Sequence, residues 1–369
     1  MFIETKSTRA TSRSGYRIAV VPGDGIGSEV VPAAVEVIEA AARHCGLALD
    51  LTWKPWSAAR SLETGDIIPP GGLAEIEGCD AILFGAHGAP GVPDHVAAWQ
   101  LLFAMRHTFD QYANLRPIRL SPGVEPRLRL PPGVDIDLAI VRENTEGEFA
   151  GPGGVSGRGT PVEQATQLTV ITRYGTERIA RFAFDLARTR RGHVTTVTKS
   201  NSMPHALGYW DRVVDEIAEA YPDVAHRKLY VDAAAAEFVL RPESFDVVLA
   251  TTLHGDILSD LGAALTGGLG LAPSGNVNPE RRFPSLFEPI HGSAPDIAGQ
   301  GVANPTACML AGAMLLEHLG EHAAGRWVRR AVGLVLREGR IRTRDLGGSA
   351  TTRAFTDAVL GAVDHVMSS

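Results

Sequence analysis

The chain has 369 residues and a formal net charge of −7, with 44% hydrophobic and 21% charged residues. At about 150 residues per domain this length suggests two domains, and the balance of apolar and charged residues excludes a disordered chain. The acidic excess argues against a general nucleic-acid binder and against binding to an anionic membrane surface, because both need a basic face.

Strand patterns alternate with helical patterns from about residue 16 onward. An apolar run at 17–21 predicts a strand, and apolar residues at helical spacing from Val30 to Ala41 predict a helix after it. Further strands are predicted at 80–86, 135–141, 167–174, 193–199, 227–233 and 245–251, and further helices at 177–188, 305–319, 323–338 and 351–366. This alternation predicts an α/β fold in which helices cover a largely buried sheet.

The N-terminal segment and the cysteines indicate the cellular compartment to expect for the protein. Residues 1–15 are polar, which predicts a flexible N-terminal tail and not a secretory signal. No run of eighteen apolar residues occurs. Cys45, Cys79 and Cys308 are far apart and form no CxxC pair, so we expect reduced thiols and neither disulfides nor a zinc site. A cytoplasmic protein without a membrane span is therefore expected.

A glycine-rich loop joins the first predicted strand to the first predicted helix. Its residues are Gly23-Asp24-Gly25-Ile26-Gly27, and Ser28 stands where a dinucleotide-binding GxGxxG motif needs its third glycine. We therefore favour a tight strand-to-helix turn over a pyrophosphate cradle.

Three arginines form a candidate anion site. Arg106 and Arg116 flank the segment HTFDQYANL, and Arg142 begins RENTEGEF. Guanidinium groups bind carboxylates through two parallel hydrogen bonds, so three arginines in one pocket would suit a dicarboxylic substrate. Each of them taken singly is more typical of a surface ion pair.

Acidic residues and one lysine form a second candidate site. Asp256 and Asp260 are four residues apart, so on a helix their carboxylates share one face, and Asp232 at the end of a predicted strand could join them. Such oxygen ligands suit Mg²⁺ or Mn²⁺. Lys199 ends the strand predicted at 193–199, where a buried lysine can act as a base. A solvated acidic pair and a lysine that merely reaches solvent are the plain alternatives.

A long loop rich in glycine and proline runs from Glu288 to Pro305 and contains His291, Asp296 and Asn304. Its backbone N–H groups could wrap a nucleotide before the following helix. An ordinary long connection is the alternative.

Taken in order, these segments resemble the β-decarboxylating dehydrogenases, which include the isocitrate, 3-isopropylmalate, homoisocitrate and tartrate/D-malate dehydrogenases. The matching motifs are PGDGIGSEV, YANLRP, VRENTEGE, KSN, YVDA, FDVVLATTLHGDILSDL, EPIHGSAPDIAGQGVANP and DLGGSATT. The segment VPDHVAAWQLLFAMRHTFDQYANLRP is most similar to the tartrate/D-malate branch.

The resemblance implies a two-domain α/β fold of the isocitrate/isopropylmalate dehydrogenase type with a mixed sheet, different from the Rossmann fold. Residues 16–111 and 267–369 would form a large coenzyme-binding domain. Residues 112–266 would form a small domain with the dimer interface and the metal and substrate residues. The resemblance also implies a homodimer in which the partner supplies the lysine and one aspartate of each site.

The resemblance further implies an enzyme that oxidises a malate-type 2-hydroxy acid, D-malate or tartrate, with NAD and with Mg²⁺ or Mn²⁺. The implied catalytic and metal-binding residues are Lys199, Asp232, Asp256 and Asp260, with Asp232 in both roles. The implied substrate-binding residues are Arg106, Arg116, Arg142, Trp99, Leu102 and Phe103. The implied coenzyme-binding residues are Asn201, Glu288, His291, Gly292, Ser293, Ala294, Asp296 and Asn304.

Four residues depart from the family pattern. Phe149 replaces the tyrosine that serves as general acid, so completion of the decarboxylation is left open. Thr252 replaces an asparagine, His254 an aromatic residue and His87 a small apolar residue near the nicotinamide. Two alternatives therefore stay open: activity on 3-isopropylmalate or isocitrate, and a regulatory paralogue that binds ligand without turnover.

Overall fold

The computed structural model describes residues 15–128, 130–131 and 133–368. Its strands are β1 (Gly15–Gly23), β2 (Ala48–Trp53), β3 (Ala81–Ala86), β4 (Ala113–Arg119), β5 (Asp137–Glu143), β6 (Gly153–Ser156), β7 (Gln164–Gln167), β8 (His193–Thr198), β9 (Ala225–Tyr230), β10 (Val247–Ala250), β11 (Pro273–Val277) and β12 (Ser285–Pro289).

Its α-helices are α1 (Gly27–His44), α2 (Ala58–Thr64), α3 (Gly72–Ile76), α4 (Asp94–Ala97), α5 (Ala104–Thr108), α6 (Arg173–Arg188), α7 (Ala206–Ala218), α8 (Val231–Leu240), α9 (Thr252–Leu265), α10 (Thr306–His318), α11 (His322–Glu338) and α12 (Thr352–Ser368). A π-helix, Ala98–Phe103, connects α4 to α5. Short 3₁₀ turns occur at Pro242–Ser244, Leu269–Leu271 and Arg344–Leu346.

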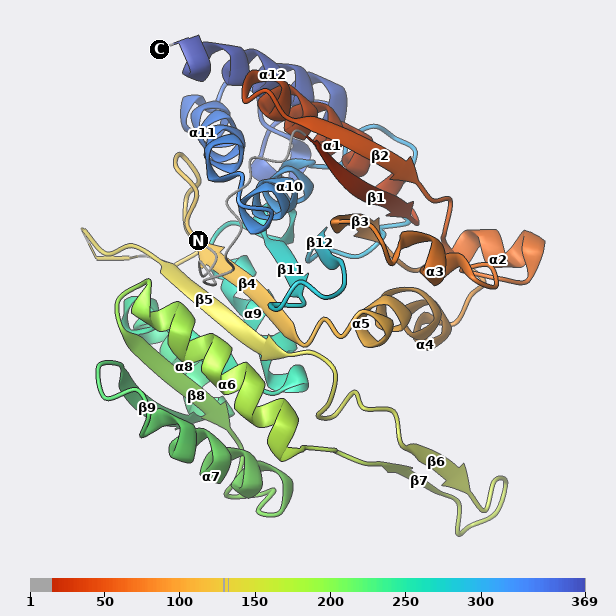
Figure 1. Ribbon diagram of the computed structural model, residues 1–369, viewed down its shortest axis with the longest axis vertical. Coiled ribbons are helices and arrows are strands. Elements are labelled where there is room, and N and C mark those ends of the chain that lie inside the picture. Colours follow the sequence, from red (N-terminus) through yellow and green to blue (C-terminus); the bar gives the residue numbers. More distant parts are fainter. Residues whose placement is uncertain (1–14, 129, 132, 369) are drawn as a thin grey trace.

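One ten-stranded mixed sheet organises the molecule, with strand order β2-β1-β3-β12-β11-β4-β5-β10-β8-β9 (Figure 1). The antiparallel neighbours are β12 with β11, β11 with β4, and β4 with β5, whereas the other pairs are parallel. Strands from both ends of the chain form one half of the sheet, and strands from the middle of the chain form the other. The division into residues 16–111 with 267–369 and residues 112–266 stays a prediction.

Side chains of successive strand residues point to opposite faces, and the core follows this alternation. On β5, Ala139 and Val141 belong to a large apolar cluster with α1, α6, α7 and α10 to α12, whereas Leu138 and Ile140 belong to a separate cluster with α8 and α9. A third cluster joins β1 and β3 to α2 and α5. The second face of the sheet therefore carries two apolar clusters, and the polar residues described below lie between them.

The glycine-rich loop forms the expected tight turn between β1 and α1. Gly23 has a φ of 71°, and a Cβ there would lie 1.9 Å from the carbonyl oxygen of Ala86. The buried Asp24 carboxylate accepts hydrogen bonds from the backbone N–H groups of Ala58 and Gly88 at 2.9 and 3.0 Å. The turn thus holds β3 and the start of α2 together.

Two strand predictions are corrected. The strand predicted at 167–174 is wrong, because β7 ends at Gln167 and α6 begins at Arg173, where the Thr172 hydroxyl accepts a hydrogen bond from the N–H of Gly175. The strand predicted at 227–233 ends at Tyr230, so Asp232 lies in the first turn of α8, where the helix dipole favours a carboxylate.

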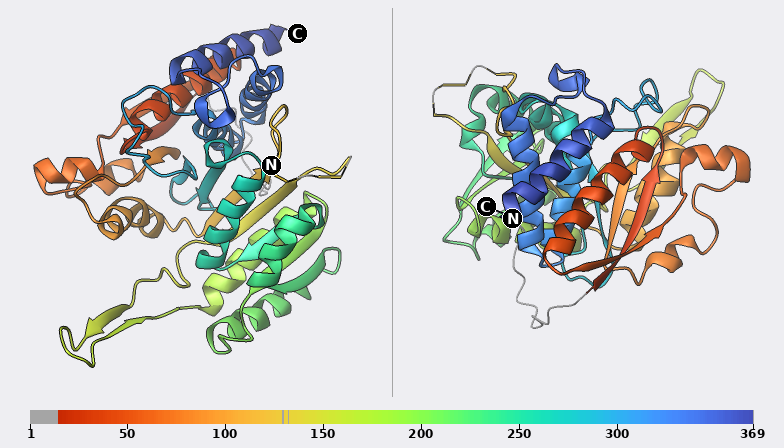
Figure 2. Two further views of the ribbon diagram at one scale, coloured as in Figure 1. Left: turned by 180° about the vertical axis from the view of Figure 1, so that it is seen from behind. Right: turned by 90° about the horizontal axis from the view of Figure 1, so that it is seen from above.

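Of the tail predicted at 1–15, Gly15 belongs to β1 and the rest lies outside the described residues. The β6–β7 hairpin projects from the molecule (Figure 2), and all its strand residues are exposed. Cys45, Cys79 and Cys308 are unpaired thiols. Within the described residues, no helix has both the length and the apolar character that a membrane span needs.

Candidate functional site

A cleft of about 280 Å³ opens on the second face of the sheet, between the two apolar clusters of that face. Its wall comes from the end of β3, the π-helix, α5, β4, β5, α9 and the end of β12. The lining residues are Phe84, Gly85, Ala86, His87, Ala98, Leu102, Phe103, Arg106, Arg116, Arg142, Phe149, Asp256, Asp260, Glu288, Pro289, Ile290, His291 and Gly292.

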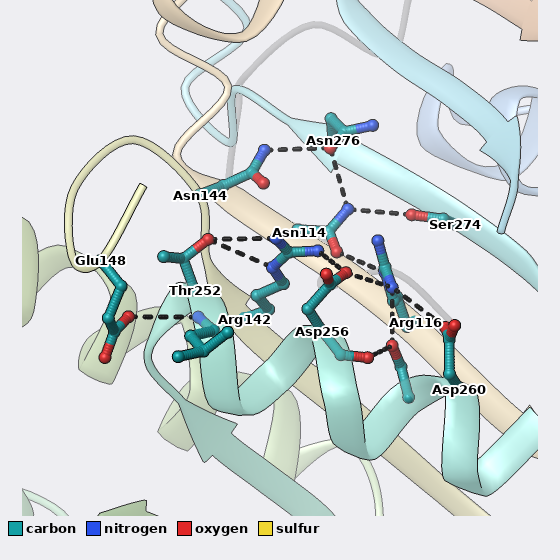
Figure 3. Close-up of polar contacts among 12 residues, drawn as sticks. Asn114, Arg116, Arg142, Asn144, Glu148, Thr252, Asp256, Asp260, Ser274 and Asn276 are labelled. Atoms are coloured by element: carbon teal, nitrogen blue, oxygen red, sulfur yellow. Dashed lines mark hydrogen bonds and ion pairs between the residues drawn. The ribbon is translucent and has the colours of Figure 1, made fainter. Parts of the chain in front are cut away.

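The three arginines converge on this cleft from three elements. Arg106 comes from α5, Arg116 from β4 and Arg142 from β5, and all three are buried. The antiparallel register pairs Asn114 with Arg142, which brings Arg116 and Arg142 to neighbouring positions on the same face (Figure 3). The structure therefore makes one cationic site of residues that each resembled a surface arginine in the sequence.

The cleft lining carries three arginines and three carboxylates, and each arginine forms at least one ion pair with them. Arg116 and Arg142 both contact Asp256 Oδ1, and the Arg116 contact is 3.2 Å. Burial and the neighbouring guanidinium of Arg116 lower the pKa of Arg142. Arg106 Nη2 lies 3.2 Å from Glu288 Oε1, while the buried Arg106 Nε has no hydrogen-bond partner among the described residues. A bound carboxylate would supply the missing acceptor.

Asp256 and Asp260 share one face of α9, as their spacing predicted, and both line the cleft. Their side chains are 41% and 56% exposed. Burial acts to raise the pKa of Asp256, but Arg142 and Arg116 outweigh it and lower that pKa, whereas burial and the Asp256 charge raise the pKa of Asp260 despite Arg116. Two carboxylates one helical turn apart are a donor set suited to Mg²⁺ or Mn²⁺.

Lys199 and Asp232 lie outside this cleft in the single chain. Lys199 follows β8 directly, and its Nζ lies 2.5 Å from Asp232 Oδ1 in α8. This hydrogen bond lowers the pKa of Asp232. Among the described residues of one chain, no three His, Cys, Asp or Glu side chains come together as metal ligands. The predicted set of Asp232, Asp256 and Asp260 is therefore not assembled within one chain.

Aromatic rings in the cleft wall pack against two of the arginines. Leu102 and Phe103 line the cleft from the π-helix, together with Phe149. The Phe103 and Phe149 ring centres are 6.0 Å apart, and the guanidinium carbons of Arg106 and Arg142 lie 5.3 and 5.4 Å from the Phe103 and Phe149 centres respectively.

Trp99, which was expected to contact substrate, lies behind this wall. It packs edge-on against Phe103 with ring centres 5.1 Å apart and stacks on the ring of His107 at 6.0 Å. Trp99 is not among the residues that line the cleft.

The other three departures from the family pattern also lie in or near the cleft. The Thr252 hydroxyl accepts hydrogen bonds from Arg142 Nε and Nη2 at 3.3 and 3.1 Å (Figure 3). His254 is buried in the first turn of α9, and its Nδ1 has no partner among the described residues. His87 lines the cleft, and burial lowers its pKa against the opposing effect of Glu288.

The loop from Glu288 to Asn304 is divided between the cleft and its surroundings. Glu288, His291 and Gly292 line the cleft. Beyond them, the carbonyl of Ser293 accepts a hydrogen bond of 2.9 Å from the N–H of Ile26, which docks the loop on the glycine-rich turn. Four more residues were expected at the coenzyme. Asp296 and Asn201 are exposed, and Ala294 has a φ of 41°. Asn304 donates a hydrogen bond of 2.8 Å to Asp345 Oδ2.

Several residues that shape the cleft escaped the sequence analysis. Asn114 Oδ1 accepts a hydrogen bond of 2.8 Å from Arg116 Nε, and Ser259 Oγ lies 2.6 Å from Arg116 Nη1. Glu148 accepts a hydrogen bond of 3.1 Å from the N–H of Leu253 and so caps α9. Alternate residues of a strand share one face, so the position of Asn114 two residues before Arg116 on β4 could have identified it. The contacts of Ser259 and Glu148 join segments that are far apart in the sequence.

A second hollow of about 290 Å³ lies elsewhere, between the loop at Val124 and the segment from Arg342 to Gly347. Its lining includes none of the residues predicted for the site, although Asp345 contacts Asn304. The cleft with the three arginines is therefore the candidate site.

Comparisons with known proteins give three consistent findings. A family model described as isocitrate/isopropylmalate dehydrogenase matches residues 17–359. The D-malate dehydrogenase (decarboxylating) of Escherichia coli strain K12 is 47% identical over 93% of this chain and 97% of its own length, and the tartrate dehydrogenase/decarboxylase of Pseudomonas putida is 46% identical over 93% and 96%. The crystal structure of isocitrate dehydrogenase from Methylococcus capsulatus has a TM-score of 0.85 at 38% identity, covering 94% of this chain and 99% of that one.

Proposed function

The chain belongs to the isocitrate/isopropylmalate dehydrogenase family, and from this premise we propose that it oxidises a malate-type 2-hydroxy acid, D-malate or tartrate, with NAD and a divalent metal ion. The observation that carries the proposal is the convergence of Arg106, Arg116 and Arg142 on one cleft that also presents Asp256 and Asp260. A small dicarboxylate with a hydroxyl group has the matching charges.

The arginines bind and orient the substrate. The unpartnered Nε of Arg106 and the guanidinium groups of Arg116 and Arg142 donate to the two carboxylates, and all three arginines are buried. In such surroundings charge-assisted hydrogen bonds are stronger than in water. The substrate hydroxyl is thereby directed toward the α9 carboxylates.

The residues present fit a divalent cation. Asp256 and Asp260 offer hard oxygen donors without competing sulfur or nitrogen, as Mg²⁺ and Mn²⁺ prefer. When bound, such an ion would lower the pKa of the substrate hydroxyl and stabilise a developing enolate. We assign Asp232 of the partner subunit as the third ligand, because Asp232 lies outside the cleft of its own chain.

Lys199 is the proposed base, and it reaches the cleft of the partner subunit in a homodimer. The contact with Asp232 Oδ1 at 2.5 Å positions its Nζ. In its neutral amine form Lys199 would take the hydroxyl proton, and NAD, when bound, would supply the acceptor for the hydride from C2. Its position outside the cleft of its own chain supports shared sites, and the exposed β6–β7 hairpin offers a surface for pairing.

The coenzyme is proposed to lie along the loop that follows β12. Glu288, His291 and Gly292 would meet the nicotinamide end in the cleft, while Asp296 is exposed for the adenosine ribose. A carboxylate there accepts the ribose 2′-hydroxyl and repels a 2′-phosphate, which favours NAD over NADP.

Decarboxylation is the step that this chain is least equipped to complete. Phe149 lines the cleft but has no proton to donate to carbon. We therefore propose that oxidation is retained and that the enolate is protonated poorly. In the cell we expect the enzyme in the cytoplasm, with no nucleic-acid or membrane partner.

The test is NADH formation followed by absorbance with Mn²⁺ and NAD, using D-malate, tartrate, isocitrate and 3-isopropylmalate in parallel. Turnover of D-malate or tartrate supports the proposal. A preference for isocitrate or 3-isopropylmalate assigns the chain to another branch of the family. Ligand binding without NADH formation from any of the four acids indicates a regulatory paralogue.

A further inference from the structure

Buried amide side chains form a hydrogen-bonded chain that reaches Arg116 of the cleft (Figure 3). Asn114 is on β4, Asn276 is on β11 and Asn144 follows β5, and all three are buried. The register pairs Asn276 with Asn114, so both side chains occupy the sheet face that carries Arg116 and the cleft. Nothing in the roles inferred from the family includes these amides.

Asn276 is the centre of this chain. Its Oδ1 accepts hydrogen bonds from Asn114 Nδ2 and Asn144 Nδ2, each at 2.9 Å. Its Nδ2 donates to Glu288 Oε1 at 2.7 Å. The same Glu288 oxygen lies 3.2 Å from Arg106 Nη2. A single side chain therefore connects three strand segments and ends against a substrate arginine.

The arginines at the two ends of the chain fix the direction of the hydrogen bonds that run from Arg116 through Asn114, Asn276 and Glu288 to Arg106, whereas the carbonyl of Gln111 orients the Asn144 amide. A guanidinium group can only donate, so Arg116 Nε requires the oxygen of Asn114 on its side. The Asn114 amide nitrogen then faces Asn276, so the side-chain oxygen of Asn276 must accept this hydrogen bond. The Asn276 amide nitrogen therefore points toward Glu288. An ionised Glu288 accepts from both Asn276 and Arg106, and the sequence of donors and acceptors closes without conflict.

We propose that Asn276 is a positioning residue that holds Arg106 and Arg116 at a fixed separation for the two substrate carboxylates. It acts through Glu288 on one side and Asn114 on the other. Because Glu288 also begins the proposed coenzyme loop, Asn276 ties the substrate clamp to the coenzyme side of the cleft. This inference rests on the proposed function, since it assumes a dicarboxylate between the two arginines.

The decisive variant is Asn276→Asp, which keeps the shape and replaces the donating NH₂ by an oxygen that faces Glu288. Two carboxylates at that separation repel, which displaces Glu288 and, with it, Arg106. Arg106 contributes to binding in both the ground state and the transition state, so the loss should appear mainly in KM. Because hydrogen bonds to charged groups are lost, we expect the KM for D-malate to rise by about tenfold to a hundredfold and kcat to change less.

The matched control is Asn278→Asp, two residues further along the chain. Asn278 and Asn276 are both 0% exposed. Asn278 Nδ2 donates to the carbonyl of Asp110 at 2.9 Å, so the same substitution again turns an oxygen toward an oxygen. Within the described part of the chain, the hydrogen bonds of Asn278 go to Asp110, Arg281, Arg282 and Ser285, and none of these is a cleft arginine. We expect this control to lower the thermal unfolding temperature and to leave KM unchanged.

A second variant, Asn276→Ser, breaks the same hydrogen bonds without adding charge and should raise KM in the same direction if Asn276→Asp fails to fold. Direct titration of D-malate by calorimetry, in the presence of Mn²⁺, provides a readout besides turnover. If KM is unchanged in both folded Asn276 variants while the wild type is active, the positioning role of Asn276 is overturned and the proposed function is not. A wild type that neither oxidises nor binds D-malate or tartrate overturns the proposed function and this inference with it.

Discussion

Restoring a hydroxyl at position 149 should change the balance between the two products of the reaction. Phe149→Tyr adds a phenol at the wall where the ring lies 6.0 Å from Phe103 and 5.4 Å from the Arg142 guanidinium. General acid catalysis contributes about 10²–10⁴-fold, or roughly 3 to 5 kcal/mol of barrier, to a proton transfer. The missing donor should slow protonation of the enolate far more than hydride transfer, which in the proposed mechanism depends on Lys199 and the α9 carboxylates.

The assay measures CO₂ released per NADH formed, together with the configuration of the product made in D₂O. For the wild type we expect less than one CO₂ per NADH, or a product labelled without stereocontrol. Phe149→Tyr should raise the ratio of CO₂ to NADH. The matched control is Phe103→Tyr, which adds the same hydroxyl to the neighbouring ring of the wall and should leave that ratio unchanged.

His87 is the rival donor, because it lines the same cleft. Stoichiometric CO₂ and a single product enantiomer from the wild type would refute the reasoning about Phe149. If His87→Gln then abolished CO₂ release while NADH formation continued, His87 would be identified as the acid. A ratio unaffected by both His87→Gln and Phe149→Tyr would place the donor elsewhere.

Three further predictions concern the cofactors and the assembly. EDTA should abolish turnover, Mn²⁺ should restore it, and Asp256→Asn should remove the response to Mn²⁺; full activity in EDTA contradicts the metal assignment. The kcat/KM for NAD should exceed that for NADP, because the proposed position of Asp296 would repel a 2′-phosphate. Asp296→Asn should bring the two kcat/KM values closer together. Equal kcat/KM values for NAD and NADP in the wild type count against this role of Asp296. Inactive Lys199→Ala and Asp256→Asn chains should regain activity when mixed, since some heterodimer sites then hold both native residues; mixed dimers shown to form but inactive would place each site within one chain.

The sequence predicted those parts of the site that depend on local periodicity. Asp256 and Asp260 share a face of α9 because four residues make about one helical turn. The isocitrate/isopropylmalate dehydrogenase-like α/β fold expected from the resemblance is confirmed by the ten-stranded mixed sheet and by the solved structure it matches. The glycine-rich turn is confirmed as well, since Gly23 packs directly against Ala86.

The remaining parts depend on contacts between distant segments, and single-sequence patterns do not encode these. The burial of Arg106, Arg116 and Arg142 in one cleft follows from the pairing of β4 with β5 and from the position of α5. The strand predicted at 167–174 failed because Thr172, which suits a strand by propensity, instead caps α6. The contacts of Trp99 with His107 and Phe103 are likewise not encoded by its place in the sequence, and its role at the substrate stays a prediction.

The most direct test of the central claim is the fate of the hydrogen at C2 of the substrate. D-malate deuterated at C2, and in parallel tartrate deuterated at the same position, would be incubated with the enzyme, NAD and Mn²⁺, and the reduced coenzyme analysed by mass spectrometry. The account predicts deuterium in the NADH formed from at least one of the two acids, and none when Arg106, the proposed ligand of a substrate carboxylate, is replaced by leucine. NADH without deuterium, or no NADH from either acid, would contradict the assignment of this cleft to 2-hydroxy acid oxidation.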